Sequence, residues 1–219
     1  MVQVQRSAIP TSTRFHDGLS KPKSQPLIAF DIETIVDCDL ARHYLKLDNH
    51  DDAAIREGVR QYHLDTTAGK NDFPRQLFHL VVSISYVKAT LAQDGLAVQE
   101  VGTFRCDDKH SAYDSERKMV SDFFACIDQR RPRLISFNGK TFDMPVLQFR
   151  ALKYGIQSKV FFDKSNKWEN YQHKYDVNHH CDLRDVLLDF GVASSGMKLQ
   201  EVCASVSYTH LTLPTIYSV

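Results

Sequence analysis

The chain has 219 residues, enough for one α/β domain with a hydrophobic core of its own. Lysine and arginine together number 27, as do aspartate and glutamate, so the net charge is zero. This balance gives no global basic field and argues against strong non-specific DNA binding, but it permits an enzyme that holds a nucleic-acid end locally. No apolar run is long enough to predict a membrane span.

The cysteines are scattered, odd in number and never spaced as C-x-x-C. This pattern argues against a disulfide framework and against a zinc site built from cysteines. It fits a reducing compartment, so we expect a cytoplasmic protein. The five positions are Cys38, Cys106, Cys126, Cys181 and Cys203.

The first 26 residues are polar and lack the apolar core of a secretory signal, so residues 1–26 are expected to form a flexible leader. Residues 27–35 are apolar and bounded by proline, which predicts a buried central strand. Residues 36–75 have weak helical spacing and are interpreted as an insertion beside the sheet. Strands are predicted at 79–88 and 96–104, with a turn between them that favours an antiparallel hairpin.

A helix is predicted to begin near residues 111–115, where serine and aspartate can cap it. Its apolar face is expected to consist of Val120, Phe123, Phe124 and Ile127. A short strand at 133–137 leads into a helix that ends at Gly155. Further helical stretches are predicted at 181–190 and 197–203. The order of elements indicates an α/β fold, a mixed β-sheet flanked by helices.

Two carboxylates stand at alternate positions of the first predicted strand, in the sequence Phe-Asp-Ile-Glu-Thr. Alternation along a strand points Asp31 and Glu33 to one face and Phe30 and Ile32 to the other. Like charges side by side repel and lose hydration when buried, and a divalent cation is the usual compensation.

The second motif, Asn-Gly-Lys-Thr-Phe-Asp-Met-Pro, follows the strand at 133–137. It places Asp143 where a helix begins, a position that favours negative charge. Taken alone, Asp143 could be a helix cap and Asn138-Gly139 a tight turn. Together with Asp31 and Glu33, it predicts a magnesium or manganese site.

The two motifs together resemble the first and second exonuclease motifs of the DEDD 3′→5′ exonuclease superfamily. Within it, they are most similar to the predicted exonucleases related to the proofreading domain of family B DNA polymerases. The resemblance extends over roughly residues 27–205 and implies a ribonuclease H-like fold. It also covers His180-Cys181-Asp182-Leu183, which resembles an H-x-D-L segment whose role is open.

The resemblance implies a 3′→5′ exonuclease that uses two Mg²⁺ or Mn²⁺ ions to hydrolyse phosphodiesters at the 3′ end of single-stranded DNA. Asp31, Glu33 and Asp143 would be the catalytic metal ligands. The residues near the substrate strand would be Ile32, Thr34, Asn138 and Phe142.

The superfamily's third motif, a Tyr or His followed four residues later by Asp, is not found before Ser205. Residues 206–219 carry no charged side chain and resemble translated sequencing-adapter DNA, although an ordinary strand is the alternative. We therefore expect an exonuclease-like domain at 27–205, incomplete at its C-terminal side, and a non-native tail at 206–219. This chain is then expected to be inactive.

Four alternatives remain open. The substrate could be RNA, or the chain could be a nucleic-acid-binding module without catalysis. A transition-metal cluster could be formed by His173, His179, His180, Cys181 and Asp182, although their spacing fits no zinc pattern. Arg130, Arg131 and Arg133 could contact nucleic acid or simply form a solvated helix end.

Overall fold

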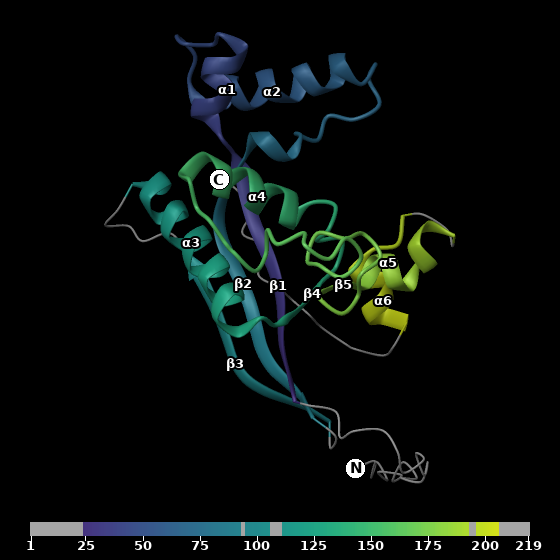
Figure 1. Ribbon diagram of the computed structural model, residues 1–219. Coiled ribbons are helices and arrows are strands. Elements are labelled where there is room, and N and C mark those ends of the chain that lie inside the picture. The colour runs from purple at the N-terminus through teal and green to yellow at the C-terminus, as the bar shows by residue number, and fades with distance from the viewer. Residues whose placement is uncertain (1–23, 93–94, 106–110, 193–195, 206–219) are drawn as a thin grey trace, which may run out of the picture.

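The computed structural model describes residues 24–92, 95–105, 111–192 and 196–205. Its centre is a five-stranded mixed sheet in the order β3-β2-β1-β4-β5 (Figure 1). The strands are β1 (Gln25–Val36), β2 (His79–Ala92), β3 (Gly95–Arg105), β4 (Arg133–Ser136) and β5 (His180–Asp182). The predicted α/β class and mixed sheet with flanking helices are confirmed.

The sheet has an antiparallel half and a parallel half that meet at β1. β1 pairs with β2 along its whole length, and β2 pairs with β3, which confirms the expected hairpin with longer strands than predicted. β4 runs parallel to both β1 and β5. The carboxyl ends of β1, β4 and β5 therefore point the same way, the arrangement in which α/β proteins place their sites.

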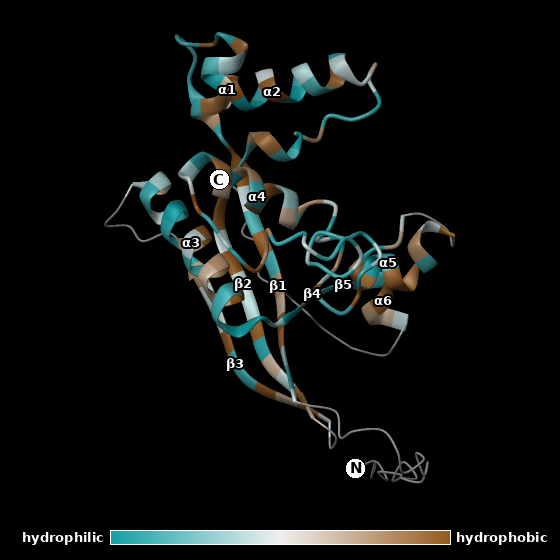
Figure 2. Ribbon diagram, viewed as in Figure 1, coloured by the Kyte–Doolittle hydropathy of each residue, from teal (hydrophilic) through white to brown (hydrophobic). Residues whose placement is uncertain are grey.

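Helices α3 (Ala112–Arg130) and α4 (Asp143–Tyr154) supply the core that packs on the β1 side chains Ile28, Phe30 and Ile32. All four residues of the predicted apolar face of α3 are buried. Ser111 caps the start of α3, and Gly155 ends α4 in a left-handed conformation. Figure 2 shows hydrophobic residues along the strands beneath these helices.

The predicted insertion forms α1 (Cys38–Leu45) and α2 (Asp52–Thr66), followed by the short η1 helix (Gln76–Phe78). These elements lie beyond the carboxyl end of β1 (Figure 1). They have a small core of their own, made of Ala41, Ile55, Val59 and Phe78. The insertion is therefore a packed unit beside the end of the central strand.

A network of buried charges joins α4 to the end of β1; it consists of Asp37, Glu116 and Arg150. Arg150 Nη1 donates to Asp37 Oδ2 at 2.6 Å, and its Nη2 donates to Glu116 Oε2. Arg150 is 2% exposed and both acids are fully buried. Glu116 also accepts the Val81 N–H at 2.7 Å, so the network connects β1, β2, α3 and α4.

Two boundaries differ from the sequence prediction. Residues 181–182 were expected to begin a helix but belong to strand β5, whose three residues each pair with β4. Helix α5 (Leu183–Leu187) follows, then η2 (Asp189–Gly191) and α6 (Leu199–Ser205). β1 begins at Gln25, so Pro26 lies inside the strand instead of before it.

Most of the expected leader, residues 1–23, and the expected tail, residues 206–219, lie outside the described residues. Among the helices that are described, none combines the length and the apolar character needed to cross a membrane.

Candidate functional site

The carboxylates of β1 lie on the sheet face opposite the core. Phe30 and Ile32 are buried, while Asp31 and Glu33 are exposed, so the alternation expected from the sequence is present. Exposure leaves both carboxylates accessible to ions and to substrate. The face that carries them is open because α3 and α4 pack on the other side.

Asp143 approaches β1 through a gap in the sheet. β4 pairs with β1 only over Leu27–Ala29, so the edge of β1 beyond Ala29 is free of β4. The first residue of α4 fills this position, and Asp143 Oδ1 accepts the Ile32 N–H at 3.1 Å. Asp143 therefore lies beside the backbone between Asp31 and Glu33. The structure therefore brings Asp143 to β1 close enough for its pKa to respond to the charge of Asp31.

The carboxylates repel one another strongly in this arrangement. Asp143 is 5% exposed, and burial first and the charge of Asp31 second raise its pKa to about 7. The pKa of Asp31 is also raised, by desolvation and then by Glu33, although its side chain reaches the surface. A buried carboxyl with a raised pKa beside a like charge is typical of functional sites.

These residues fit a hard divalent cation, since carboxylate oxygens are the ligands that Mg²⁺ and Mn²⁺ prefer. Within the described ranges, however, no three His, Cys, Asp or Glu side chains converge as a ready-made ligand group. The fit therefore rests on the oxygen ligands that the carboxylates offer and on the negative charge of Asp31 and Asp143, which a cation would compensate.

The turn between β4 and α4 has little steric freedom. Asn138 adopts a left-handed conformation with φ of 67°, which asparagine tolerates better than most residues. A Cβ on Gly139 would lie 2.4 Å from Ser136 Oγ and 3.6 Å from Asp143 Oδ2. Only glycine fits there, so the Asn-Gly pair is a steric requirement of the turn next to Asp143.

Asp182 holds this turn from β5, and its role could not be predicted from the sequence. Its carboxylate accepts three backbone N–H groups: Asn138 at 2.7 Å, Lys140 at 2.9 Å and Arg184 at 3.0 Å. Arg184 Nη1 also donates to Asn138 Oδ1 at 2.8 Å, which fixes the amide of that side chain. The H-x-D-L segment was the available signal, because an acid directly before a helix is a common cap.

Replacing this acid should loosen the turn. We expect Asp182→Asn to lower the free energy of unfolding by about 2 kcal/mol, because an amide nitrogen would face a backbone donor and leave it unsatisfied. Urea denaturation measures the loss, and amide exchange at Asn138 and Lys140 should accelerate. The neighbouring Asp185→Asn is the matched control. Equal stability of the two variants would contradict the assignment.

The remaining predicted substrate residues differ in what they expose. Thr34 Oγ1 lies 2.9 Å from His79 Nδ1, and Phe142 is half-buried at the start of α4. The side chain of Ile32 is buried in the core at 6% exposure. Ile32 therefore contributes its backbone N–H to the site.

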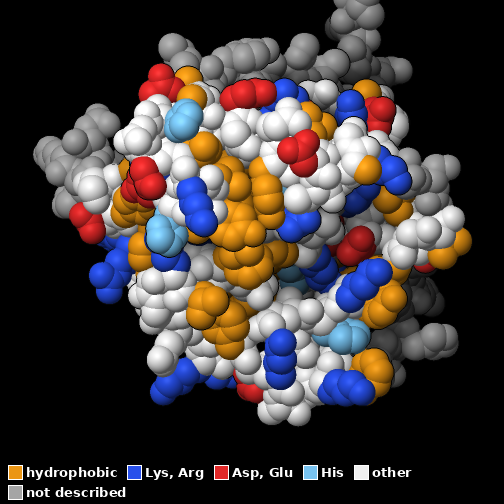
Figure 3. Space-filling view, turned by 90° about the horizontal axis from the view of Figure 1, so that it is seen from above, with side chains coloured by type: hydrophobic (Ala, Val, Ile, Leu, Met, Phe, Trp, Pro, Cys, Tyr) orange, Lys and Arg blue, Asp and Glu red, His pale blue; other side chains and the backbone are white. Residues whose placement is uncertain are grey.

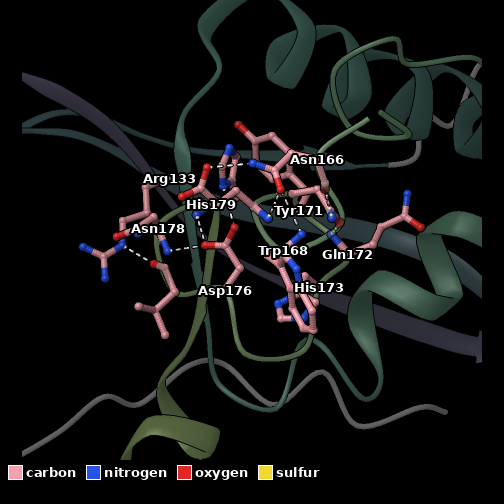
Figure 4. Close-up of polar contacts among 12 residues, drawn as sticks. Arg133, Asn166, Trp168, Tyr171, Gln172, His173, Asp176, Asn178 and His179 are labelled. Carbon is pink, nitrogen blue, oxygen red and sulfur yellow. Dashed lines mark hydrogen bonds and ion pairs between the residues drawn. The ribbon is translucent and has the colours of Figure 1, made fainter. Parts of the chain in front are cut away.

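The histidine-rich segment before β5 is organised by local polar contacts (Figure 4). His179 Nδ1 lies 2.7 Å from Asp176 Oδ2, and Arg133 Nε donates to Val177 O at 2.7 Å. Arg133 is thus engaged with the loop, while Arg130 and Arg131 end α3. The basic cluster is largely a helix end, as the simpler interpretation expected.

His180 contacts other partners than His179 does. Its ring is fully buried, with Nε2 2.8 Å from Ser136 Oγ. Burial and the charge of Lys140 lower its pKa to about 3, so the ring is neutral. Since Asp182 binds the turn and His179 binds Asp176, the alternative of a transition-metal cluster has no support within the part of the chain that is described.

Comparison with protein families decides the relationship. The model of "predicted 3′-5′ exonuclease related to the exonuclease domain of PolB" matches residues 71–209, more than half of the chain. The chain belongs to this family. The match contains the Asp143 motif and Asp182, and it begins after the Asp31 motif. The ribonuclease H-like α/β class expected from the sequence agrees with this membership, and no curated protein matches the chain.

Solved structures similar to the chain include three of exonuclease I. An ExoI/SSB-Ct complex is 10% identical with a TM-score of 0.41, covering 80% of this chain and 32% of that one. E. coli exonuclease I with a dT13 oligonucleotide is 13% identical, with a TM-score of 0.36 and coverages of 75% and 29%. Apo exonuclease I is 13% identical, with a TM-score of 0.37 and coverages of 80% and 33%. The chain spans about a third of the length of these proteins.

Proposed function

We propose that this domain is a divalent-metal-dependent 3′→5′ exonuclease that acts on single-stranded DNA ends. The observation that chiefly supports it is the position of Asp143, a buried acid with a pKa of about 7 beside Asp31 at the open edge of β1. A divalent cation is the simplest partner for such a pair. Membership of the exonuclease family supports the type of reaction.

The three acidic residues would bind the metal ions. Asp31 would hold a site shared by two ions, with Glu33 contributing to one ion and Asp143 to the other. Two bound Mg²⁺ or Mn²⁺ ions would supply a more acidic attacking water and relieve charge on the phosphate and the leaving 3′ oxygen. The Ile32 N–H keeps the Asp143 carboxylate oriented toward β1. The turn at Asn138 would border the substrate strand.

We also propose that the 219 residues alone bind DNA without hydrolysing it. After Asp143 the sequence contains no Tyr or His with Asp at the fourth following position. At Tyr208, for example, the fourth following residue is Thr212. The attacking water would then lack the residue that orients it and a fourth carboxylate. Extension of the chain through its own downstream reading frame should restore hydrolysis if that frame supplies the motif.

The test uses DNA and RNA oligomers labelled at the 5′ end, the extended protein and Mn²⁺. We expect stepwise shortening of single-stranded DNA from its 3′ end. Asp31→Ala should slow it at least about 100-fold, the scale of losing one group that stabilises a transition state. Asp122→Ala, an exposed acid paired with Lys118 on α3, is the matched control and should be as active as the wild type.

Shortening that survives Asp31→Ala would overturn the proposal. Preferential shortening of RNA would reassign the substrate, and DNA binding without shortening by the extended protein would favour a binding module.

A further inference from the structure

Three aromatic rings gather at the catalytic edge, and we call Phe73, His79 and Phe142 the ring cluster. The centroids of Phe73 and His79 are 5.3 Å apart, and those of Phe73 and Phe142 are 5.5 Å apart. His79 and Phe142 meet edge to face at 4.9 Å. These distances lie in the range of favourable aromatic pairs.

Two members of the cluster are attached directly to the carboxylate site. Phe142 immediately precedes Asp143, and His79 bonds to Thr34, the residue after Glu33. His79 Nε2 lies 3.0 Å from Pro74 O, which can only accept, so Nε2 donates and Nδ1 accepts the Thr34 hydroxyl. The imidazole is held in one neutral orientation, and burial, the largest cause, lowers its pKa accordingly.

Phe73 is the exposed member of the cluster. It is 54% exposed, whereas His79 is 5% exposed. The rings of His79 and Phe142 contact Phe73, which also lines a cleft of about 840 Å³. The cleft is also lined by Glu33, Thr34 and Arg56. Figure 3, seen from the end where α1 and α2 lie, shows hydrophobic side chains gathered across the middle of this face, with Lys, Arg and His as well as Asp and Glu around them.

We propose that the ring cluster is a stacking site for the unpaired base of the 3′-terminal nucleotide, with Phe73 as its platform. This inference rests on the proposed function and extends it to a residue outside both acidic motifs. An exposed flat apolar ring fits the π-face of any base, so the site would tolerate all sequences. Because a paired base is already stacked in its duplex, the site would favour single strands.

The position of the cluster favours a base over other apolar ligands. Glu33 lines the same cleft, so a base on Phe73 would lie near one of the three carboxylates that would bind metal. Arg56 supplies a cation in the cleft for a backbone phosphate, and Asp39 and Asp52 on the rim are already paired with Arg42 at 2.9 Å. An apolar protein segment would require neither the acids nor the arginine.

The experiment measures fluorescence anisotropy of the 219-residue chain with Ca²⁺ and two single-stranded DNA oligomers. One oligomer is complete, and the other carries an abasic 3′-terminal nucleotide. For the wild type we expect about tenfold weaker binding of the abasic oligomer. Phe73→Ala should bind the complete oligomer about tenfold more weakly and should not distinguish the two, while Phe73→Trp should retain the distinction.

Trp168→Ala removes another exposed ring, 64% exposed, from the loop before β5 and is the matched control with unchanged binding. Wild-type protein that binds both oligomers equally, or Phe73→Ala that still distinguishes them, overturns the stacking site alone. Wild-type protein that binds neither oligomer overturns the proposed function as well. Self-association that Phe73→Ala abolishes, with equal binding of both oligomers, would assign the cleft to a second copy of the chain.

Discussion

In metal-free buffer at pH 8, Asp143→Asn is expected to raise the free energy of unfolding by roughly 2–4 kcal/mol, at about 1.4 kcal/mol per unit of pKa shift. The reason is that the wild type must ionise a carboxyl buried at 5% exposure beside Asp31. Asparagine keeps an oxygen for the Ile32 N–H at the same position and carries no charge.

The sign follows from the proton count of each state. Asp143 has a pKa of about 7 in the folded protein and about 3.8 when unfolded, so the folded state binds more protons between these values. Its contribution to stability therefore falls as pH rises from about 4 to 7. The difference in unfolding free energy between Asp143→Asn and wild type should grow over this window and level off above it. The pKa of His180 is lowered, so its contribution to stability changes with pH in the opposite direction. That contribution is the same in the wild type and in Asp143→Asn, so it cancels in the difference between them.

Urea denaturation at several pH values measures the difference, and Mn²⁺ supplies the control. Added Mn²⁺ should stabilise the wild type at pH 8 far more than the variant, because a ligand stabilises the state that binds it. A difference that does not change with pH would show that the buried carboxyl carries no such penalty.

Arg150→Met is expected to lower the free energy of unfolding by about 3–5 kcal/mol. The substitution removes the cation between Asp37 and Glu116, both fully buried, and leaves two acids without compensation. Because Arg150 lies on the helix that begins with Asp143, the variant should also bind Mn²⁺ more weakly.

Chemical denaturation and calorimetric titration with Mn²⁺ measure the two effects. Arg60→Met is the matched control, since Arg60 forms an exposed pair with Glu57 and its replacement should leave the stability nearly unchanged. A triple variant that also neutralises Asp37 and Glu116 should recover much of the lost stability. Similar losses in Arg150→Met and Arg60→Met would show that the buried network is not a support of α4.

Periodic features could be predicted from the sequence. The alternation around Asp31 and Glu33 is a local consequence of strand geometry, and the buried face of α3 follows from helical spacing. The end of α4 at Gly155 follows from the conformational freedom of glycine. Each of these signals is contained within one element, so it is visible without knowledge of the partners.

Features that depend on distant partners could not be predicted. β5 has only three residues and is defined by its pairing with β4, so its sequence carries no strand pattern. Asp182 looks like an ordinary cap until the turn at Asn138 folds over it. Arg150 and Glu116 look like surface charges on amphipathic helices, because their burial results from the way α3, α4 and β1 come together.

The gap between β1 and β4 has a mechanical consequence. β1 pairs with β4 only over Leu27–Ala29. No β4 residue is therefore paired with the part of β1 that carries Asp31, where Asp143 at the start of α4 approaches. A small rotation of α4 would change the distance between the two carboxylates without breaking the pairing of β1 with β4. A cation bound by Asp31 and Asp143 would connect β1 to α4, and its radius would set the distance between the two carboxylates.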